Sequence, residues 1–402
     1  MRQIDDKLIE AVSSTYKQSK YIKNPTCYFY DLDAILKNID NLQNSLPSQI
    51  RLYYAMKANN NAKVMECVCN HKYTTGIEIA SYGEMEQALK YKNSNNIIFT
   101  GPGKTDYEVE QAILKKIQFI NVESVLEAIR IDRIARLKNV DHVDILLRIN
   151  LNYCITDATE HMSGYSTKMG IDEEECIEAI RYIKSLDRVR IKGIHVFAAS
   201  GVLNYEGLLK SNKYIFDLVL KLEKEIGKIS IIDLGGGLGI DYTDSGFVFD
   251  IDSYGRELSN LIDEYKFNNK KIFMELGTYI VGNAGYYTAK IIDIKRVKGR
   301  KHIIIAGGVN HMGLPLEMRR KHPIAIVPMY EKKLYDNQPR VCKELVDISG
   351  PLCMVSDKLS WDEYVEEAMV GDVVVFLQAG AYCYGEGMHA FLSHFYPDEI
   401  II

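Results

Sequence analysis

Short apolar runs alternate with longer amphipathic stretches between about residue 35 and residue 275. Each run has four to seven residues, and most are rich in Ile, Val, Phe or Tyr. Such runs suit strands that are buried on both faces of a parallel sheet. The runs are Arg51 to Met56, Thr75 to Ala80, Asn96 to Thr100, Phe119 to Val122, Asp144 to Asn150, Ile191 to Phe197, Ile229 to Leu234 and Lys271 to Glu275.

The stretches between these runs have helical periodicity and carry helix-start signals. Thr105 to Glu108 and Ser124 to Glu127 both match the capping box, in which a hydroxyl and a Glu three residues later bond free backbone amides. Eight strand-then-helix units in a row predict a parallel (β/α)8 TIM barrel over residues 35–275. A doubly wound open sheet is the alternative, but that fold rarely contains eight such units.

The pattern changes after residue 275, where strand-like runs separated by turns replace the helical periodicity. This change indicates a mainly antiparallel β domain. The segment Thr26 to Tyr30 is also strand-like and is expected to pair with this second domain. We therefore predict a barrel at 35–275 and a β domain made of 1–34 and 276–402. The later runs are Tyr286 to Val297, His302 to Ala306, Glu344 to Ser349 and Asp372 to Leu377.

The composition is that of an ordinary globular protein, with 47% hydrophobic and 26% charged residues. A net charge of −5 and scattered lysines do not favour a nucleic-acid partner. Eight irregularly spaced cysteines, without CxxC or HExxH, predict neither a disulfide framework nor a metal site. The first residues mix both charge signs, and no apolar run approaches the ~18 residues of a membrane span. We therefore expect a cytoplasmic protein without a membrane partner.

Polar side chains fall where the predicted barrel strands end. In a parallel barrel these ends form the mouth that carries catalytic groups. Singly, each has an ordinary explanation: a solvated lysine, a core histidine, an ion pair of the arginine with the last carboxylate, or a tight turn at the glycines. Their joint placement at one mouth favours a functional site. From the first strand to the eighth they are Lys57, Glu78, Arg148, His195, the run Gly235 to Gly239, and Glu275.

This combination suits pyridoxal 5'-phosphate (PLP). A lysine amine can form a Schiff base with the PLP aldehyde, and glycine amides after the seventh strand can approach its phosphate. A carboxylate against the pyridine nitrogen keeps that nitrogen protonated, so the ring can take up electrons from a departing carboxylate. An imidazole over the ring face would fix the plane of the ring.

Several short motifs, spread over nearly the whole chain, occur together in the sequences of one known family. They are Tyr53 to Asn59, Gly76 to Ser81, Asp233 to Gly237, Glu275 to Gly277, Gly350 to Cys353 with Asp357, and Gly380 to Tyr382. In this order they resemble the motifs of the fold-type III PLP-dependent decarboxylases, which include the ornithine, arginine and diaminopimelate decarboxylases. The resemblance implies a PLP-dependent carboxy-lyase.

The resemblance also implies roles for individual barrel residues. Lys57 would carry the Schiff base, Glu275 would pair with the pyridine nitrogen, and His195 would stack on the ring. Glu78 and Arg148 would line the back wall of the cofactor site. Gly235, Gly236 and Gly237 would hold the phosphate.

Two further residues are implied to act at a subunit interface. The family forms its active sites between the subunits of a homodimer, and Cys353 and Tyr382 would lie at or near that interface. Cys353 would donate a proton to the carbanion after carbon dioxide leaves, and Tyr382 would contact the cofactor.

The chain departs from the family at the phosphate. The family usually has an arginine three residues after the pyridine-partner glutamate, where this chain has Thr278, and a serine where this chain has Ala198. We expect Thr278 and Ser200, together with the motif residue Gly277, to bind the phosphate instead. A threonine hydroxyl can bond a phosphate but supplies no positive charge.

A third departure concerns the substrate. Decarboxylases of free diamino acids tend to carry Asp or Glu near the position of Met354, where it pairs with the distal ammonium. A buried ammonium without a partner is costly, so Met354 suits a substrate whose distal amine is blocked. Met354 and Asp357 are candidate substrate-binding residues. A citryl blocking group would need cations, for which Arg319, Arg320 and Lys321 are the candidates.

Other segments narrow the resemblance to decarboxylases of carboxylate-siderophore pathways. They are Asn59 to Asn61, Gly101 to Thr105, Gly277 through Tyr287, and Phe391 to Pro397. The closest resemblance is to N-citrylornithine decarboxylase of the rhizoferrin type, with the citryl-diaminopropionate and glutamyl-carrier-protein decarboxylases as near relatives. It implies decarboxylation of a citryl-linked diamino acid. The alternatives are free ornithine or lysine, a carrier-bound amino acid, an amino-acid racemase, or a catalytically silent regulator of a decarboxylase.

Overall fold

The computed structural model of the chain describes residues 4–156, 158–243, 245–329 and 338–402. It contains two compact units, which we call the barrel unit and the β unit. The barrel unit comprises Leu36–Ile240 and Phe247–Tyr279, and the β unit comprises Met1–Ile35, Asp241–Gly246 and Ile280–Ile402. Residues 1–3, which belong to the charged N-terminal stretch considered above, lie outside the described residues.

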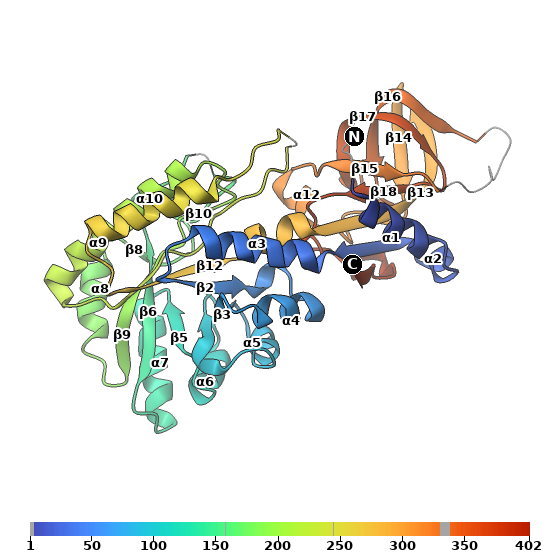
Figure 1. Ribbon diagram of the computed structural model, residues 1–402. Coiled ribbons are helices and arrows are strands. Elements are labelled where there is room, and N and C mark those ends of the chain that lie inside the picture. The colour runs from blue at the N-terminus through green and yellow to red at the C-terminus, as the bar shows by residue number, and fades with distance from the viewer. Residues whose placement is uncertain (1–3, 157, 244, 330–337) are drawn as a thin grey trace. The chain divides into compact units, whose positions relative to one another are not determined.

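The barrel unit contains eight parallel strands (Figure 1). They are β2 (Ile50–Ala55), β3 (Thr74–Ile79), β4 (Ile97–Phe99), β5 (Phe119–Val122), β6 (Val143–Asn150), β9 (Val189–His195), β11 (Ile231–Asp233) and β12 (Lys271–Leu276). Their order is β5-β4-β3-β2-β12-β11-β9-β6, and pairing of β5 with β6 closes the sheet. The predicted (β/α)8 barrel is thus confirmed.

Apolar side chains from several strands fill the barrel interior. They include Tyr53, Ile98, Phe119, Leu146, Ile231 and Phe273, all nearly or fully buried. Because these side chains come from strands far apart in the sequence, the barrel has a packed core rather than a channel. The short strand β8 (Ile171–Asp172) extends the sheet beside β6, and β7 (Glu160–His161) pairs with β10 (Ala199–Ser200).

Helices connect the strands and lie outside the sheet (Figure 1). They are α3 (Leu32–Ser45), α4 (Ala62–Asn70), α5 (Tyr82–Ala88), α6 (Asp106–Leu114), α7 (Val125–Leu137), α8 (Cys176–Ile183), α9 (Tyr205–Ile226) and α10 (Ile251–Glu264), with short 3-10 turns η1 (Met56–Ala58) and η2 (Ser94–Asn96). Most begin at a side chain that accepts a hydrogen bond from a free helix amide. These N-caps are Asn61, Ser81, Thr105, Ser124, Asn204 and Asp250.

Of the two predicted capping boxes, the one at Thr105 is complete and the one at Ser124 is only half formed. The Ser124 hydroxyl accepts from the Glu127 amide at 3.1 Å. The Glu127 carboxylate does not reach back to the Ser124 amide; it accepts from the Glu123 amide and from Lys104 Nζ, both at 2.8 Å. The prediction was wrong here because the buried Lys104 ammonium needs a counter-charge.

The β unit is built on one large sheet. Its strands are β1 (Thr26–Tyr30), β13 (Gly285–Val297), β14 (Arg300–Ile305), β15 (Ile324–Val327), β16 (Arg340–Ser349), β17 (Lys358–Met369), β18 (Val373–Phe376) and β19 (Asp398–Ile401). The main order is β15-β18-β13-β14-β16-β17, and β1 pairs with β13 and β19. Most pairs are antiparallel, as predicted, but β14–β16 and β1–β19 are parallel. The predicted pairing of β1 with this domain is confirmed.

Helices cover part of this sheet. Helix α1 (Asp6–Tyr16) buries Leu8, Val12 and Tyr16 in a cluster with side chains of β1, β15 and β18. The other helices near this unit are short: α2 (Lys20–Lys23), α11 (Thr278–Val281), α12 (Leu314–Met318), and the 3-10 turns η3 (Gly282–Ala284) and η4 (Phe391–Ser393).

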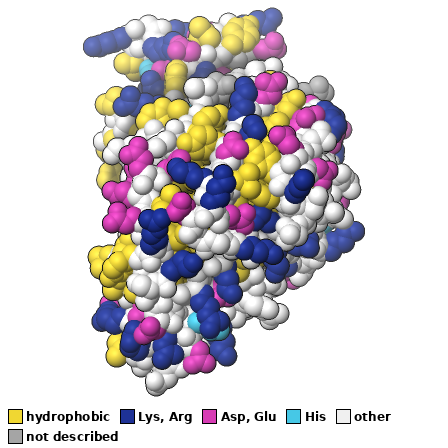
Figure 2. All heavy atoms as spheres, turned by 90° about the vertical axis from the view of Figure 1, so that its left-hand side faces the viewer, with side chains coloured by type: hydrophobic (Ala, Val, Ile, Leu, Met, Phe, Trp, Pro, Cys, Tyr) yellow, Lys and Arg dark blue, Asp and Glu magenta, His cyan; other side chains and the backbone are white. Residues whose placement is uncertain are grey.

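The distribution of surface charge is relevant to binding nucleic acids, and the hydropathy of the helices is relevant to membrane insertion. On the face drawn in Figure 2, Lys and Arg side chains are interspersed with Asp and Glu side chains. No helix within the described ranges combines the length and the hydropathy needed to cross a bilayer.

Candidate active site

Lys57 and Glu78 meet at the carboxyl ends of two adjacent strands. Lys57 lies in η1, which directly follows β2, and Glu78 lies in β3, opposite Ala55 of β2. Lys57 Nζ donates to both carboxylate oxygens of Glu78 at 3.0 Å. The Lys57 side chain is 41% exposed, whereas that of Glu78 is 0% exposed. The buried carboxylate therefore holds an accessible amine in place.

His195, Asp233 and Glu275 form a buried cluster at the ends of β9, β11 and β12. His195 and Asp233 are register partners, and His195 Nε2 lies 3.3 Å from Glu275 Oε2. One ligand atom from each of the three residues lies within 4.8 Å of the others. Both His195 ring nitrogens and Asp233 Oδ2 are buried without a hydrogen-bond partner among the described residues. Buried polar atoms left in this state mark a place where a bound group can supply the partners.

The two carboxyl groups of this cluster are driven to opposite protonation states. Burial alone would raise the pKa of Glu275, but the nearby charges of His195 and Lys57 outweigh burial and bring this pKa down to about 2. Burial, followed by the negative charge of Glu275, raises the pKa of Asp233 well above its usual range. The cluster therefore holds one ionised carboxylate, at Glu275, beside a neutral carboxyl. A single carboxylate suits a pyridinium nitrogen better than a divalent metal ion.

We expect Asp233→Asn to retain the fold and the cofactor, because an amide can replace a neutral carboxyl and still accept the bond from the Gly235 amide. Because the pKa of Asp233 is raised in the folded protein, this carboxyl lowers the free energy of unfolding at pH values above its unfolded pKa of 3.8. Between about pH 4 and 7 the free energy of unfolding of the variant should therefore rise relative to that of the parent by up to about 1.4 kcal/mol per pH unit. This rise should stop when the pH reaches the folded-state pKa of Asp233.

Urea unfolding of both proteins at several pH values measures this difference, and absorbance titration with PLP measures cofactor affinity. Asp233→Ala, which leaves a cavity, serves as the destabilised comparison. A constant stability difference across this range, or a large loss of PLP affinity in the Asn variant, would contradict a neutral Asp233.

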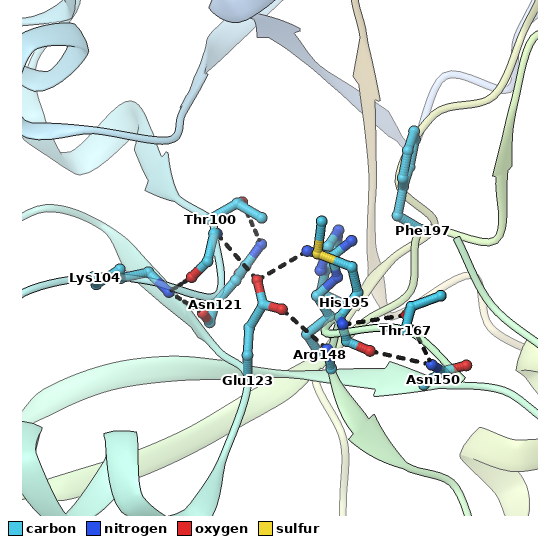
Figure 3. Close-up of polar contacts among 12 residues, drawn as sticks. Thr100, Lys104, Asn121, Glu123, Arg148, Asn150, Thr167, His195 and Phe197 are labelled. Atoms are coloured by element: carbon cyan, nitrogen blue, oxygen red, sulfur yellow. Dashed lines mark hydrogen bonds and ion pairs between the residues drawn. The ribbon is translucent and has the colours of Figure 1, made fainter. Parts of the chain in front are cut away.

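Arg148 does not pair with Glu275. Arg148 Nη1 lies 2.8 Å from Glu123 Oε1, and both side chains are nearly fully buried. The Glu123 carboxylate also accepts from the amides of Gly101 at 3.1 Å and Gly170 at 3.0 Å. Figure 3 shows this pair beside His195. The charge of Arg148 is thus neutralised by Glu123, and its predicted place in the wall of the cofactor site stays a prediction.

A second buried pair continues this network. Lys104 Nζ pairs with Glu127 at 2.8 Å. It also donates to the Asn121 carbonyl at 2.7 Å, beside Thr100 (Figure 3). Asn121 Nδ2 donates to Thr100 Oγ1 at 2.9 Å and to Glu275 Oε1 at 3.4 Å. Our sequence analysis did not select Asn121, Glu123 or Asp233. Applying the strand-end rule to the fourth barrel strand, β5, would have found the first two.

The glycine-rich turn after β11 leaves no room for side chains. A Cβ on Gly235 would lie 2.6 Å from the Val196 carbonyl oxygen, and one on Gly236 would lie 2.2 Å from that of Glu275. Gly235 and Gly237 also have φ values of +62° and +110°, which favour glycine. The turn therefore offers bare backbone at the end of the strand, as a phosphate site requires.

The remaining predicted phosphate residues follow the same strand ends. Ser200 lies in β10, shortly after β9, and Thr278 begins α11 directly after β12. A Cβ on Gly277 would lie 2.6 Å from the Ala58 side chain, next to Lys57. Ala198 is buried and has no group that can bond a phosphate. The roles of Ser200, Gly277 and Thr278 stay predictions.

In the β unit, Cys353 and Met354 lie on the loop between β16 and β17. Cys353 is exposed, and Met354 is partly buried. Asp357, a predicted substrate-binding residue, is 2% exposed, and its two oxygens accept from the backbone amides of Val309 and Leu352, both at 2.8 Å. This geometry favours a role in holding the loop of Cys353 over contact with a substrate.

Three other candidates belong to the β unit. Tyr382 is partly buried and has a φ of +63°. Arg319 is the C-cap of α12 and is exposed. The guanidinium of Arg320 stacks on Tyr242, 3.6 Å from the centre of the ring.

Comparison with known proteins gives consistent results. The family model for the pyridoxal-dependent decarboxylase, pyridoxal binding domain, matches residues 32–282. The chain is 33% identical to the 2-[(L-alanin-3-ylcarbamoyl)methyl]-2-hydroxybutanedioate decarboxylase of Staphylococcus aureus, over 97% of this chain and 98% of that protein. It is 30% identical to the L-glutamyl-[BtrI acyl-carrier protein] decarboxylase of Niallia circulans, over 93% of this chain and 88% of that protein.

Solved structures share the fold. Diaminopimelate decarboxylase from Helicobacter pylori complexed with L-lysine superposes with a TM-score of 0.84 at 24% identity, over 98% of this chain and 93% of that one. The arginine decarboxylase of Paramecium bursaria Chlorella virus gives a TM-score of 0.83 at 19% identity, over 98% and 100% of the two chains.

Proposed function

This chain belongs to the pyridoxal-dependent decarboxylases, and on that premise we propose that it decarboxylates a citryl-linked diamino acid, N-citrylornithine, in carboxylate-siderophore biosynthesis. It is a PLP-dependent carboxy-lyase with a homologue of nearly equal length that acts on a related compound. In the substrate of the Staphylococcus aureus relative, an alanine unit is joined through an amide to a hydroxybutanedioate. An amine blocked in this way carries no positive charge.

The observation that carries the proposal is Met354. It lies beside Cys353, on the loop between β16 and β17, and its thioether cannot pair with an ammonium. A free diamino acid would bring a second ammonium that needs a carboxylate partner when desolvated. A substrate with an acylated distal amine has no such requirement.

Each residue of the site then has a defined task. Bound PLP supplies an electron-accepting ring for the pair of electrons left when carbon dioxide departs. Lys57 would hold the cofactor covalently, and Glu78 keeps the Lys57 amine in position. The ionised Glu275 would stabilise positive charge on the ring nitrogen, and His195 would support the ring.

Protonation of the product is assigned to Cys353, whose side chain is exposed on its loop. We further propose that the protein is a homodimer and that Cys353 and Tyr382 act at the subunit interface, as the family resemblance implies. Sedimentation velocity with and without PLP tests the dimer.

Three alternatives remain for the experiment to separate. Free ornithine or lysine is disfavoured by Met354. A carrier-bound amino acid is favoured by the similarity to the Niallia circulans relative. A silent regulator is favoured by Thr278 and Ala198 at the phosphate positions, but it leaves the retained Lys57 and Glu275 without a purpose.

A competition assay tests the substrate class. Equal concentrations of N-citrylornithine and free ornithine are offered to the PLP-loaded protein, and the two amine products are quantified by mass spectrometry. The product ratio gives the ratio of kcat/KM directly. We expect the citryl product in large excess; an excess of putrescine would overturn the proposal.

Replacing Met354 by glutamate should shift this preference. The new carboxylate can pair with the distal ammonium of ornithine, so kcat/KM for ornithine should rise by up to about fivefold, the effect of one ion pair of about 1 kcal/mol. Met354→Leu, which keeps the site apolar, is the matched control and should retain the parent preference. Steady-state kinetics with both substrates measures the shift, and no gain with ornithine would argue against the role of Met354.

A further inference from the structure

Arg320 differs from its two basic neighbours. Lys321 Nζ pairs with Glu363 at 2.8 Å, and Arg319 is exposed in a left-handed conformation with φ of +48°. Arg320 is partly buried, with its guanidinium carbon 3.6 Å from the centre of the Tyr242 ring. At that distance the guanidinium lies on the ring face, which fixes the plane of its donors. Tyr242 closely follows the glycine-rich turn in the sequence.

The imidazole that packs against Tyr242 carries no charge. The His322 ring meets Tyr242 edge-on, with 4.9 Å between the ring centres. His322 Nδ1 donates to the Leu377 carbonyl at 3.0 Å, and Nε2 lies 3.8 Å from the Cys383 sulfur. Burial lowers the pKa of His322 to about 3, so this ring is neutral. The Tyr242 ring beneath the guanidinium and the His322 ring that meets it are therefore both uncharged.

One donor of the guanidinium lacks an acceptor among the described residues. Its Nε is buried without a hydrogen-bond partner, and within the described ranges Arg320 forms no ion pair. Glu386 contributes a negative charge to this region, because its charge acts on Tyr242 and on Cys383. A buried guanidinium donor is costly to leave unpaired, and the edge formed by Nε and one Nη matches the two oxygens of a carboxylate.

We propose that Arg320 is a carboxylate-binding residue for the acyl group of the substrate. The inference rests on the proposed function and identifies which of the three adjacent cations serves it. The amino acid's own carboxylate leaves as carbon dioxide, so the carboxylates of the citryl group are the anions that remain to be recognised. A planar, stacked guanidinium binds one of them through two parallel hydrogen bonds.

The test compares Arg320→Gln with Arg340→Gln, which alters an exposed arginine of the β unit, in the PLP-loaded enzyme. Two substrates are used: N-citrylornithine, and ornithine acetylated on its distal amine, which is blocked but carries no acyl carboxylate. Arg320→Gln should raise KM for the citryl substrate by about 30-fold while its kinetics with the acetyl compound stay within about twofold of the parent. Arg340→Gln should match the parent with both. Arg320→Lys should restore only part of the affinity, because a point charge lacks the planar fork.

Two further readouts separate the possible failures. Equal losses with both substrates would assign Arg320 a structural role, and a loss of PLP affinity in absorbance titration would assign it to the phosphate; either result overturns the proposal. Thermal stabilisation by citrate is measured without turnover. If the parent decarboxylates neither substrate, citrate stabilisation of the parent but not of Arg320→Gln upholds the carboxylate site and rejects the proposed function alone. Equal stabilisation of both rejects the site.

Discussion

Replacing Lys57 by alanine will abolish both covalent attachment of PLP and carbon dioxide release. The Lys57 amine is the group that the fold holds at the barrel mouth, with Glu78 at 3.0 Å fixing its position. Alanine removes the nucleophile, so we expect a loss of at least about 10⁴-fold in kcat, as for other groups that form covalent intermediates. The absorbance band of the Schiff base between Lys57 and PLP should disappear, and so should the change in that band on borohydride addition.

Two variants control this experiment. Lys57→Arg keeps a cation beside Glu78 but offers no nucleophilic amine, so it should fold and remain inactive. Lys63→Ala alters an exposed lysine of α4 that pairs with Glu66, and it should behave like the parent. Appreciable activity in Lys57→Ala, or borohydride labelling of a different lysine, would contradict the assignment.

Replacing Cys353 by alanine should lower kcat by about 10²- to 10⁴-fold, the range for loss of a general acid, while leaving PLP bound. The thiol is exposed, and the buried Asp357 holds its loop through two backbone amides. The retained absorbance of bound PLP distinguishes this variant from Lys57→Ala.

Cys342 supplies the matched control, because it is a second exposed cysteine of the β unit. Cys342→Ala should show the parent kcat and product. If Cys353→Ala shows unchanged kinetics and product, another group must protonate the substrate carbon.

Most of the barrel could be predicted because its strands are buried on both faces. All eight apolar runs form barrel strands, and the bounds of β5 were predicted without error. In the β unit, β15, β17 and β19 were missed. In β17, polar and charged residues such as Asp362 and Glu366 interrupt the apolar positions. Burial on one face only leaves a weaker pattern than burial on both.

The candidate site was predicted in part, for a similar reason. The strand-end rule selected Lys57 and Glu275 because their positions follow from where strands stop. It could not assign partners: Arg148 pairs with Glu123, because the alignment of neighbouring strands decides which side chains meet. The neutral state of Asp233 depends on complete burial beside Glu275, which no local pattern reveals.

The most direct test of the central claim follows the carbon that is released. N-citrylornithine labelled with ¹³C in the amino-acid carboxyl group is given to the PLP-loaded protein, and carbon dioxide and the amine product are measured together. We predict labelled carbon dioxide in equal amount to the unlabelled amine product. Unlabelled carbon dioxide, or none at all from this substrate while free ornithine reacts, would contradict decarboxylation of a citryl-linked diamino acid.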